Sequence, residues 1–114
     1  VPPTEAADRG YTLKLGSVDV LTLTETALGS APKARAEEAA AAINKRLQRA
    51  YVQQYDVTLT MDDNQANVRI RNIPVLTLTD QDARAAGMTL EALGQIARAR
   101  MRESIWREVV KREG

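Results

Sequence analysis

Hydrophobic and polar residues alternate along several short stretches of the chain. Near the start, Leu and Val occupy alternate positions of residues 11–15 and 18–24, with Thr, Lys and Asp between them. A period of two predicts strands with one buried face, and the Gly16–Ser17 pair between these two stretches predicts a hairpin turn. The alternation returns in residues 55–61, 66–71 and 75–79. The pattern therefore predicts five strands.

Two longer stretches have the spacing of amphipathic helices. Residues 33–52 and 89–112 are rich in strong helix formers, and their apolar positions recur every three or four residues. The predicted inner stripes are Ala36, Ala40, Ile43, Leu47 and Tyr51 in the first helix, and Leu90, Leu93, Ala97, Met101 and Ile105 in the second. A short helix is predicted over residues 80–86, with Thr79 or Asp80 as its N-cap and Gly87 as its end, and Thr89 is predicted to cap the last helix.

The five residues VLTLT occur twice, as Val20–Thr24 and as Val75–Thr79. An acidic residue follows each copy, and a helix comes after each. This order predicts an internal hairpin-helix duplication with halves at about 11–54 and 55–114. The predicted fold class is α+β, with about five strands in one mainly antiparallel sheet and two long helices on one face. Residues 1–10 are polar and rich in Pro, and are predicted to form a flexible arm before a single domain at 11–114.

Composition limits the chemistry that the chain can perform. The 114 residues include neither Cys nor His, 44% are hydrophobic, 27% are charged, and the formal net charge is +1. Without His or Cys, the commonest general base, thiol nucleophile and zinc ligands are missing. A net charge this small does not favour nucleic acid as a partner. We therefore predict a protein that is not an enzyme, has no catalytic residues, cofactor or metal site, and does not bind nucleic acid.

Two acidic clusters are candidate cation sites, and each has a simpler explanation. Asp80 and Asp82 are paired carboxylates, but calcium would need further oxygen ligands at loop spacing. Capping of the helix that begins there accounts for both residues. The Asp62-Asp63-Asn64 run is typical of a hairpin turn.

Three basic residues form the first candidate partner-binding site. Lys14, Arg69 and Arg71 are expected on the polar face of the predicted sheet. On neighbouring strands they would suit a carboxylate or a phosphate, because Arg binds such groups through paired hydrogen bonds. The alternative is an ordinary solvated sheet face.

The end of the last helix is the second candidate. Trp106, Val109 and Val110 lie in its final turns, beyond the reach of a short sheet. They either pack in the core or form an apolar end that meets a second copy of the chain or the next segment of a longer protein.

The order of elements resembles a known domain. The strand-turn-strand opening followed by ARAEEAAAAINKRLQRA resembles the N-terminal extracytoplasmic domain of cyanobacterial small-conductance mechanosensitive (MscS-like) ion channels. In the second half, the matching features are the strand Val75–Thr79, the Asp82-Ala83 pair, Gly87, and a helix that opens with Thr89 and reaches Leu93. The resemblance covers about residues 13–105.

This resemblance implies an extracytoplasmic, periplasmic domain attached to a membrane protein. Its role would be non-catalytic, in the assembly or sensing of a mechanosensitive-type channel, and it would bring no catalytic residues. Two alternatives come from the residues themselves. One is a free-standing module that self-associates, and the other is an anion- or ligand-binding module that uses Lys14, Arg69 and Arg71.

Overall fold

The computed structural model describes residues 10–49 and 51–113. Except for Gly10, the predicted arm at 1–10 lies outside the described residues. The predicted α+β class is confirmed. The elements in chain order are β1 (Tyr11–Leu15), β2 (Val18–Leu23), α2 (Pro32–Arg49), the 3-10 turn η1 (Gln54–Asp56), β3 (Val57–Asp62), β4 (Gln65–Ile70), β5 (Ile73–Thr79), α3 (Asp80–Ala86) and α4 (Leu90–Glu113).

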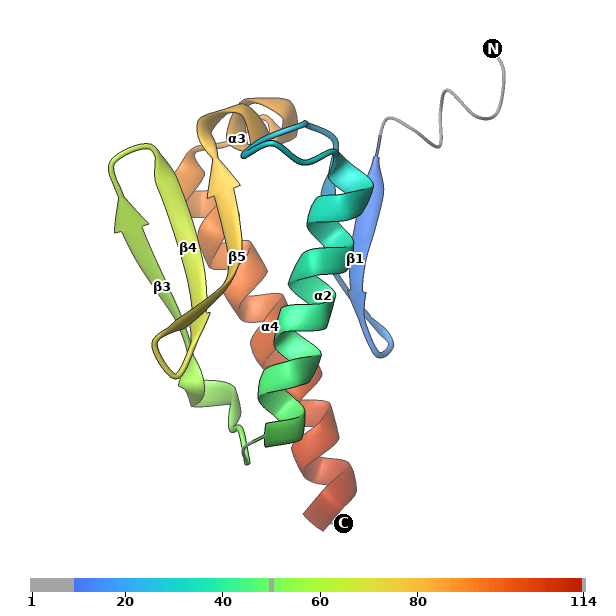
Figure 1. Ribbon diagram of the computed structural model, residues 1–114. Helices are drawn as coiled ribbons and strands as arrows, with labels where there is room; N and C mark the ends of the chain where they lie inside the picture. The colour runs from blue at the N-terminus through green and yellow to red at the C-terminus, as the bar shows by residue number, and fades with distance from the viewer. Residues whose placement is uncertain (1–9, 50, 114) are drawn as a thin grey trace.

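The strands form two antiparallel sheets, so the predicted single five-stranded sheet is wrong. β1 and β2 make a two-stranded sheet, and β3, β4 and β5 make a three-stranded sheet in that order. Figure 1 shows α2 in front, between the two sheets, and α4 running behind them. The two long helices therefore do not share one face of a continuous sheet.

Local chemistry explains where the elements begin and end. Gly16 has a φ of 62°, which suits a glycine in the tight turn between β1 and β2. Thr79 and Asp82 form the capping box of α3, and Gly87 ends that helix in the left-handed conformation. The Thr89 hydroxyl accepts a hydrogen bond from the backbone N–H of Ala92 at the start of α4. These predicted caps are confirmed.

The two halves of the chain share one hydrophobic core. α4, from the second half, packs against β2 of the first half as well as against β3 and β4, and α2 packs against β1 and β5. The inward residues of α4 are fully or nearly buried: Leu93, Ala97, Met101, Ile105 and Val109. Those of α2 are Ala36, Ala39 and Ile43. Each half therefore buries its helix partly against the strands of the other.

Two departures from the predicted α2 matter for the surface. The helix ends at Arg49, earlier than the predicted residue 52. Tyr51 consequently leaves the helical stripe, and 49% of its surface is exposed.

Within the described residues, none of the helices combines the length and the apolar character that crossing a bilayer requires.

Candidate association site at the end of α4

A buried ion pair joins α2 to the start of α3. Arg35 lies on α2, and its guanidinium donates to both carboxylate oxygens of Asp82 at 2.6 and 2.8 Å. The side chains of Arg35 and Asp82 are only 5% and 3% exposed. Two hydrogen bonds in parallel at such short distances are the strong form of this interaction. The pair thus ties the first half of the chain to the start of α3.

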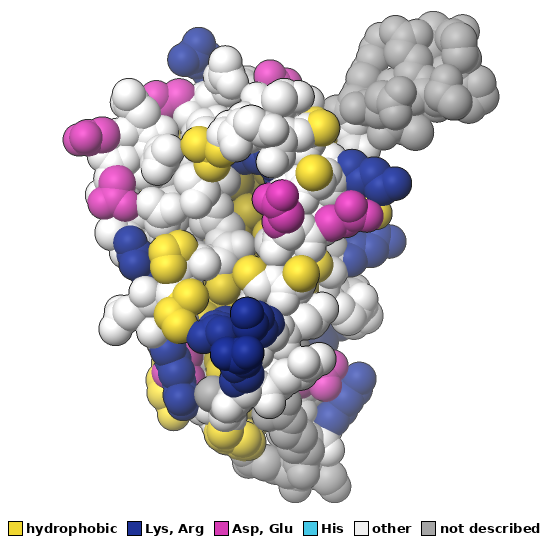
Figure 2. All heavy atoms as spheres, viewed as in Figure 1, with side chains coloured by type: hydrophobic (Ala, Val, Ile, Leu, Met, Phe, Trp, Pro, Cys, Tyr) yellow, Lys and Arg dark blue, Asp and Glu magenta, His cyan; other side chains and the backbone are white. Residues whose placement is uncertain are grey.

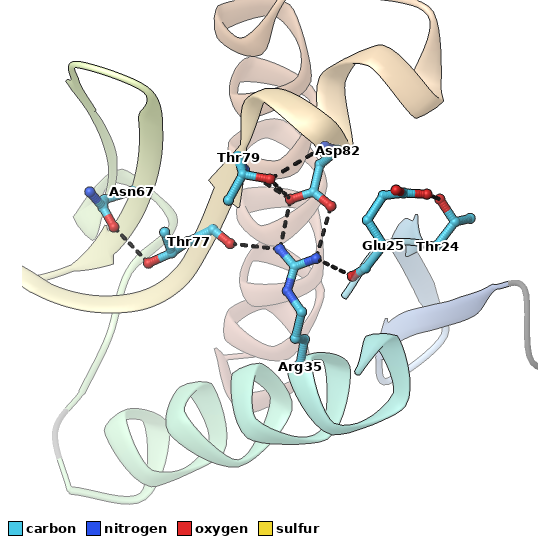
Figure 3. Close-up of polar contacts among 7 residues, drawn as sticks. All are labelled: Thr24, Glu25, Arg35, Asn67, Thr77, Thr79 and Asp82. Atoms are coloured by element: carbon cyan, nitrogen blue, oxygen red, sulfur yellow. Dashed lines mark hydrogen bonds and ion pairs between the residues drawn. The ribbon is translucent and has the colours of Figure 1, made fainter. Parts of the chain in front are cut away.

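The same guanidinium also bridges the two sheets, as Figure 3 shows. It donates to the carbonyl of Glu25, just after β2, at 2.7 Å, and to the carbonyl of Thr77 in β5 at 3.1 Å. A strand added beside β5 would need that Thr77 carbonyl for its ladder. Arg35 therefore links the segment that follows β2 to β5 through its side chain, where the two sheets share no backbone ladder.

Hydrogen bonds extend this arrangement along the polar face of the three-stranded sheet. The Thr77 hydroxyl donates to Asn67 at 2.7 Å, and the amide of Asn67 donates to Asp62 at 2.7 Å. We call Glu25, Arg35, Thr77, Thr79 and Asp82 the Arg35 network. Its members hydrogen-bond to one another and cap the N-terminus of α3, so the network has a structural role.

The Asp82 carboxyl is held ionised by these contacts. Burial alone would raise the pKa of Asp82, but hydrogen bonds from Arg35 and Thr79 and the charge of Arg35 together lower it below its ordinary value of 3.8. Within the described ranges, no three acidic side chains lie close enough together to hold a metal ion. Asp82 and Thr79 act as the capping pair of α3.

We expect the domain to lose stability as the pH falls below about 4. At pH values between the lowered pKa of Asp82 in the folded chain and its ordinary pKa in the unfolded chain, the unfolded chain binds more protons than the folded one. The free energy of unfolding therefore falls as the pH decreases through this range. The contribution of ionised Asp82 to stability is complete above the ordinary pKa of the carboxyl. It is lost as the pH falls through the lower pKa that Asp82 has in the folded chain. Urea unfolding of the wild type and Asp82→Asn across this range measures the effect. Their difference in free energy of unfolding should shrink on acidification, and a constant difference would contradict the assignment.

The structure separates Lys14 from the other two residues of the predicted basic site, Arg69 and Arg71. Lys14 lies in β1 of the two-stranded sheet, and its Nζ is 3.9 Å from Oδ1 of Asp19. Arg69 lies in β4 of the other sheet, and Arg71 follows it in the turn to β5, where it is paired with Asp56 at 3.3 Å. Because the sheets are separate, Lys14 is not on a strand that neighbours Arg69.

The last turns of α4 divide the residues of the second predicted site between two faces. Val109 is 5% exposed and belongs to the core, so it does not contribute to a surface. Trp106 and Val110 are 51% and 46% exposed. They are four residues apart and so lie one above the other on the outer face of the helix.

A pocket of about 510 Å³ lies beside these two side chains, between the end of α4 and the β1–β2 turn. Its lining includes Leu15, Gly16 and Val18 from the hairpin and Trp106 and Val110 from the helix. Pockets of roughly 300–1,000 Å³ are the size that takes up small molecules or bulky side chains. We call Trp106, Val110 and this pocket the α4-end surface.

Polar contacts hold the hairpin turn and the helix in place around the pocket. The buried Ser104 hydroxyl donates to the Leu15 carbonyl at 3.0 Å, and Arg107 donates to the Ser17 hydroxyl at 2.9 Å. Arg107 is also paired with Glu103 at 2.7 Å. The α4-end surface is thus built on two fixed elements.

Sequence reasoning missed Arg35, which it counted only as a helix-forming residue. A signal was present, because Arg35 is one turn before Ala39 and lies at the edge of the apolar stripe of α2. A charged residue in such a position needs a partner when it is buried. The partners themselves are 10, 42 and 47 residues away in the chain.

Comparison with known proteins gives one match. A family model described as "Domain of unknown function (DUF8459)" matches residues 14–108, from β1 into the last turns of α4. The matched range includes Trp106 but not Val110. No curated protein and no solved structure matches the chain.

Proposed function

We propose, from the geometry of its surface, that this member of the DUF8459 family is a non-catalytic domain that associates with a second copy of itself. The family description names no activity. The observation that carries this proposal is the α4-end surface, where Trp106 is half exposed beside a pocket on a rigid framework. Aromatic side chains of this kind are enriched among the residues that contribute most to protein interfaces.

A second copy suits the charges around this surface. Arg107 is paired with Glu103, and Lys111 lies 3.9 Å from Glu108, so both signs are present on the same part of the helix. In a two-fold arrangement the same patch meets itself, and antiparallel α4 helices would bring basic residues of one copy near acidic residues of the other. A partner of a single charge sign would gain less from these mixed pairs.

We expect Trp106→Ala to weaken self-association by at least tenfold, since truncating a central aromatic anchor costs about 2 kcal/mol or more. Sedimentation equilibrium measures the change in association constant. Met61→Ala is the matched control, because Met61 is exposed to 42% on β3, away from α4's last turns, and its truncation should leave association unchanged. A wild type that is monomeric at high concentration would contradict the proposal, and so would equal effects of the two variants.

The cellular context is a further part of this proposal and rests on the resemblance described above. We propose an extracytoplasmic accessory domain of a mechanosensitive-type channel, in which self-association supports channel assembly. The family description does not mention a channel. The full gene decides this point: a hydrophobic membrane span encoded after Gly114 would support the context, and a gene without one would contradict it.

A further inference from the structure

The charges of this nearly neutral chain are separated along the molecule. Residues 44–61 and 65–79 contain one acidic residue, Asp56, and five basic residues: Lys45, Arg46, Arg49, Arg69 and Arg71. Figure 2 shows Lys and Arg gathered over the C-terminal half of α2 and the adjacent end of the three-stranded sheet, while most Asp and Glu side chains in this view lie nearer α3. A net charge of +1 for the whole chain therefore conceals a basic end.

Hydrogen bonds hold the parts of this end together. Arg71 donates through Nη2 to the Tyr51 carbonyl at 2.7 Å and through its backbone N–H to the Asp56 carbonyl at 3.1 Å. Arg69 donates to the carbonyl of Asn72 in the same turn at 3.2 Å. The β4–β5 turn is thus fixed against the segment that follows α2, whose last turn carries Arg46 and Arg49. We call the surface formed by Lys45, Arg46, Arg49, Arg69 and Arg71 the basic end.

Exposed aromatic and aliphatic side chains lie among these cations. Tyr55 in η1 is 68% exposed, Tyr51 is 49% exposed, and Ile73 at the start of β5 is 42% exposed. A large aliphatic side chain in such a position remains in water unless a partner covers it. Tyr combines an apolar ring with a polar tip and favours the level of lipid headgroups.

We infer that the basic end docks on the surface of a lipid bilayer that carries anionic headgroups. Clustered Lys and Arg are attracted by the negative potential of such a surface, and each contributes roughly fivefold to the binding constant. Ile73 enters the boundary between headgroups and acyl chains, where burial of apolar area adds to the attraction. A nucleic acid would use the same cations, but it offers no comparable apolar environment for Ile73.

Co-sedimentation with vesicles tests this inference directly. The domain should bind vesicles of mixed phosphatidylcholine and phosphatidylserine at low salt, and binding to phosphatidylcholine alone should be much weaker. The double variant Arg46→Ala/Arg49→Ala should weaken binding to the mixed vesicles by roughly 25-fold, given about fivefold for each cation. The matched double variant Lys33→Ala/Arg84→Ala removes the same charge from exposed positions in the first turn of α2 and in α3, and should change binding little.

A second pair of variants separates apolar insertion from charge. Ile73→Ser should weaken binding several-fold, whereas Ile96→Ser, at a comparable exposure of 39% on α4, should not. Failure to bind the mixed vesicles would overturn the inference, as would equal effects of the two double variants. Binding to a single-stranded oligonucleotide that is lost in Arg46→Ala/Arg49→Ala but unaffected by Ile73→Ser would assign the basic end to nucleic acid instead. None of these results depends on Trp106, so self-association is tested independently.

Discussion

Replacing Arg35 by alanine should cost about 3–5 kcal/mol of folding free energy, because it leaves a buried charge without its partner. The Asp82 carboxylate is almost fully buried and receives two hydrogen bonds from Arg35. The carbonyls of Glu25 and Thr77 would lose a donor in the same substitution. Urea unfolding followed by circular dichroism measures the loss.

Two further variants distinguish the network from a general effect of losing an Arg on α2. Arg49→Ala, at an exposed position in the same helix, should change stability by no more than about 0.5 kcal/mol. Arg35→Lys keeps the charge but loses the paired geometry, so its cost should be intermediate.

A double-mutant cycle with Asp82→Ala completes this test. Removing both partners leaves no unpaired charge, so the double variant should be less destabilised than the sum of the two single variants by about 1 kcal/mol or more. Strict additivity would show that the two residues do not act together.

Replacing Gly94 by valine is expected to destabilise the domain by about 1–3 kcal/mol through overpacking. At Gly94, α4 approaches the three-stranded sheet closely. A Cβ added there would lie 2.9 Å from Cδ1 of Leu59 and 3.3 Å from Cβ of Ala66. The Leu59 side chain can turn aside, but Ala66 Cβ is fixed to the backbone of β4.

The size of the added side chain should decide the result at this position. Gly94→Ala gains up to about 1 kcal/mol of helix propensity and so should be near neutral. Ala99→Val, at an exposed site on α4, reports the cost of a β-branched residue in the helix without the contact. Thermal unfolding compares the three variants, and a Gly94→Val loss no larger than that of Ala99→Val would contradict the close packing.

The sequence allowed the local elements to be predicted because their signals lie within a few residues. Alternation over residues 11–15 and 18–24 and the Gly16 turn predicted the first hairpin, and Thr79 with Asp82 predicted the start of α3. The arrangement of the strands was not predictable in this way. The contacts of Arg35 join residues that are far apart in sequence and become neighbours only when both halves are folded.

The same limit explains the outcome for the candidate sites. Lys14 was grouped with Arg69 and Arg71 because five strands were expected in one sheet, and the division into two sheets separates Lys14 from the other two. Arg46 and Arg49 come near Arg71 only through the fold, because Arg71 hydrogen-bonds to the Tyr51 carbonyl in the segment that follows α2. At the end of α4, helical spacing allowed either burial or exposure. The packing of α4 on the sheets sends Val109 inward and leaves Trp106 and Val110 outside.

The fluorescence of Trp106 tests the central claim most directly, because Trp106 is the only tryptophan of the chain. If a second copy covers the α4-end surface, the emission maximum of the wild type should move to shorter wavelength as the protein concentration rises. Val110→Lys, which keeps the indole but places a charge on the same face, should retain the emission of an exposed indole at every concentration. An emission maximum that is independent of concentration in both proteins, together with a monomeric mass, would contradict association through this surface.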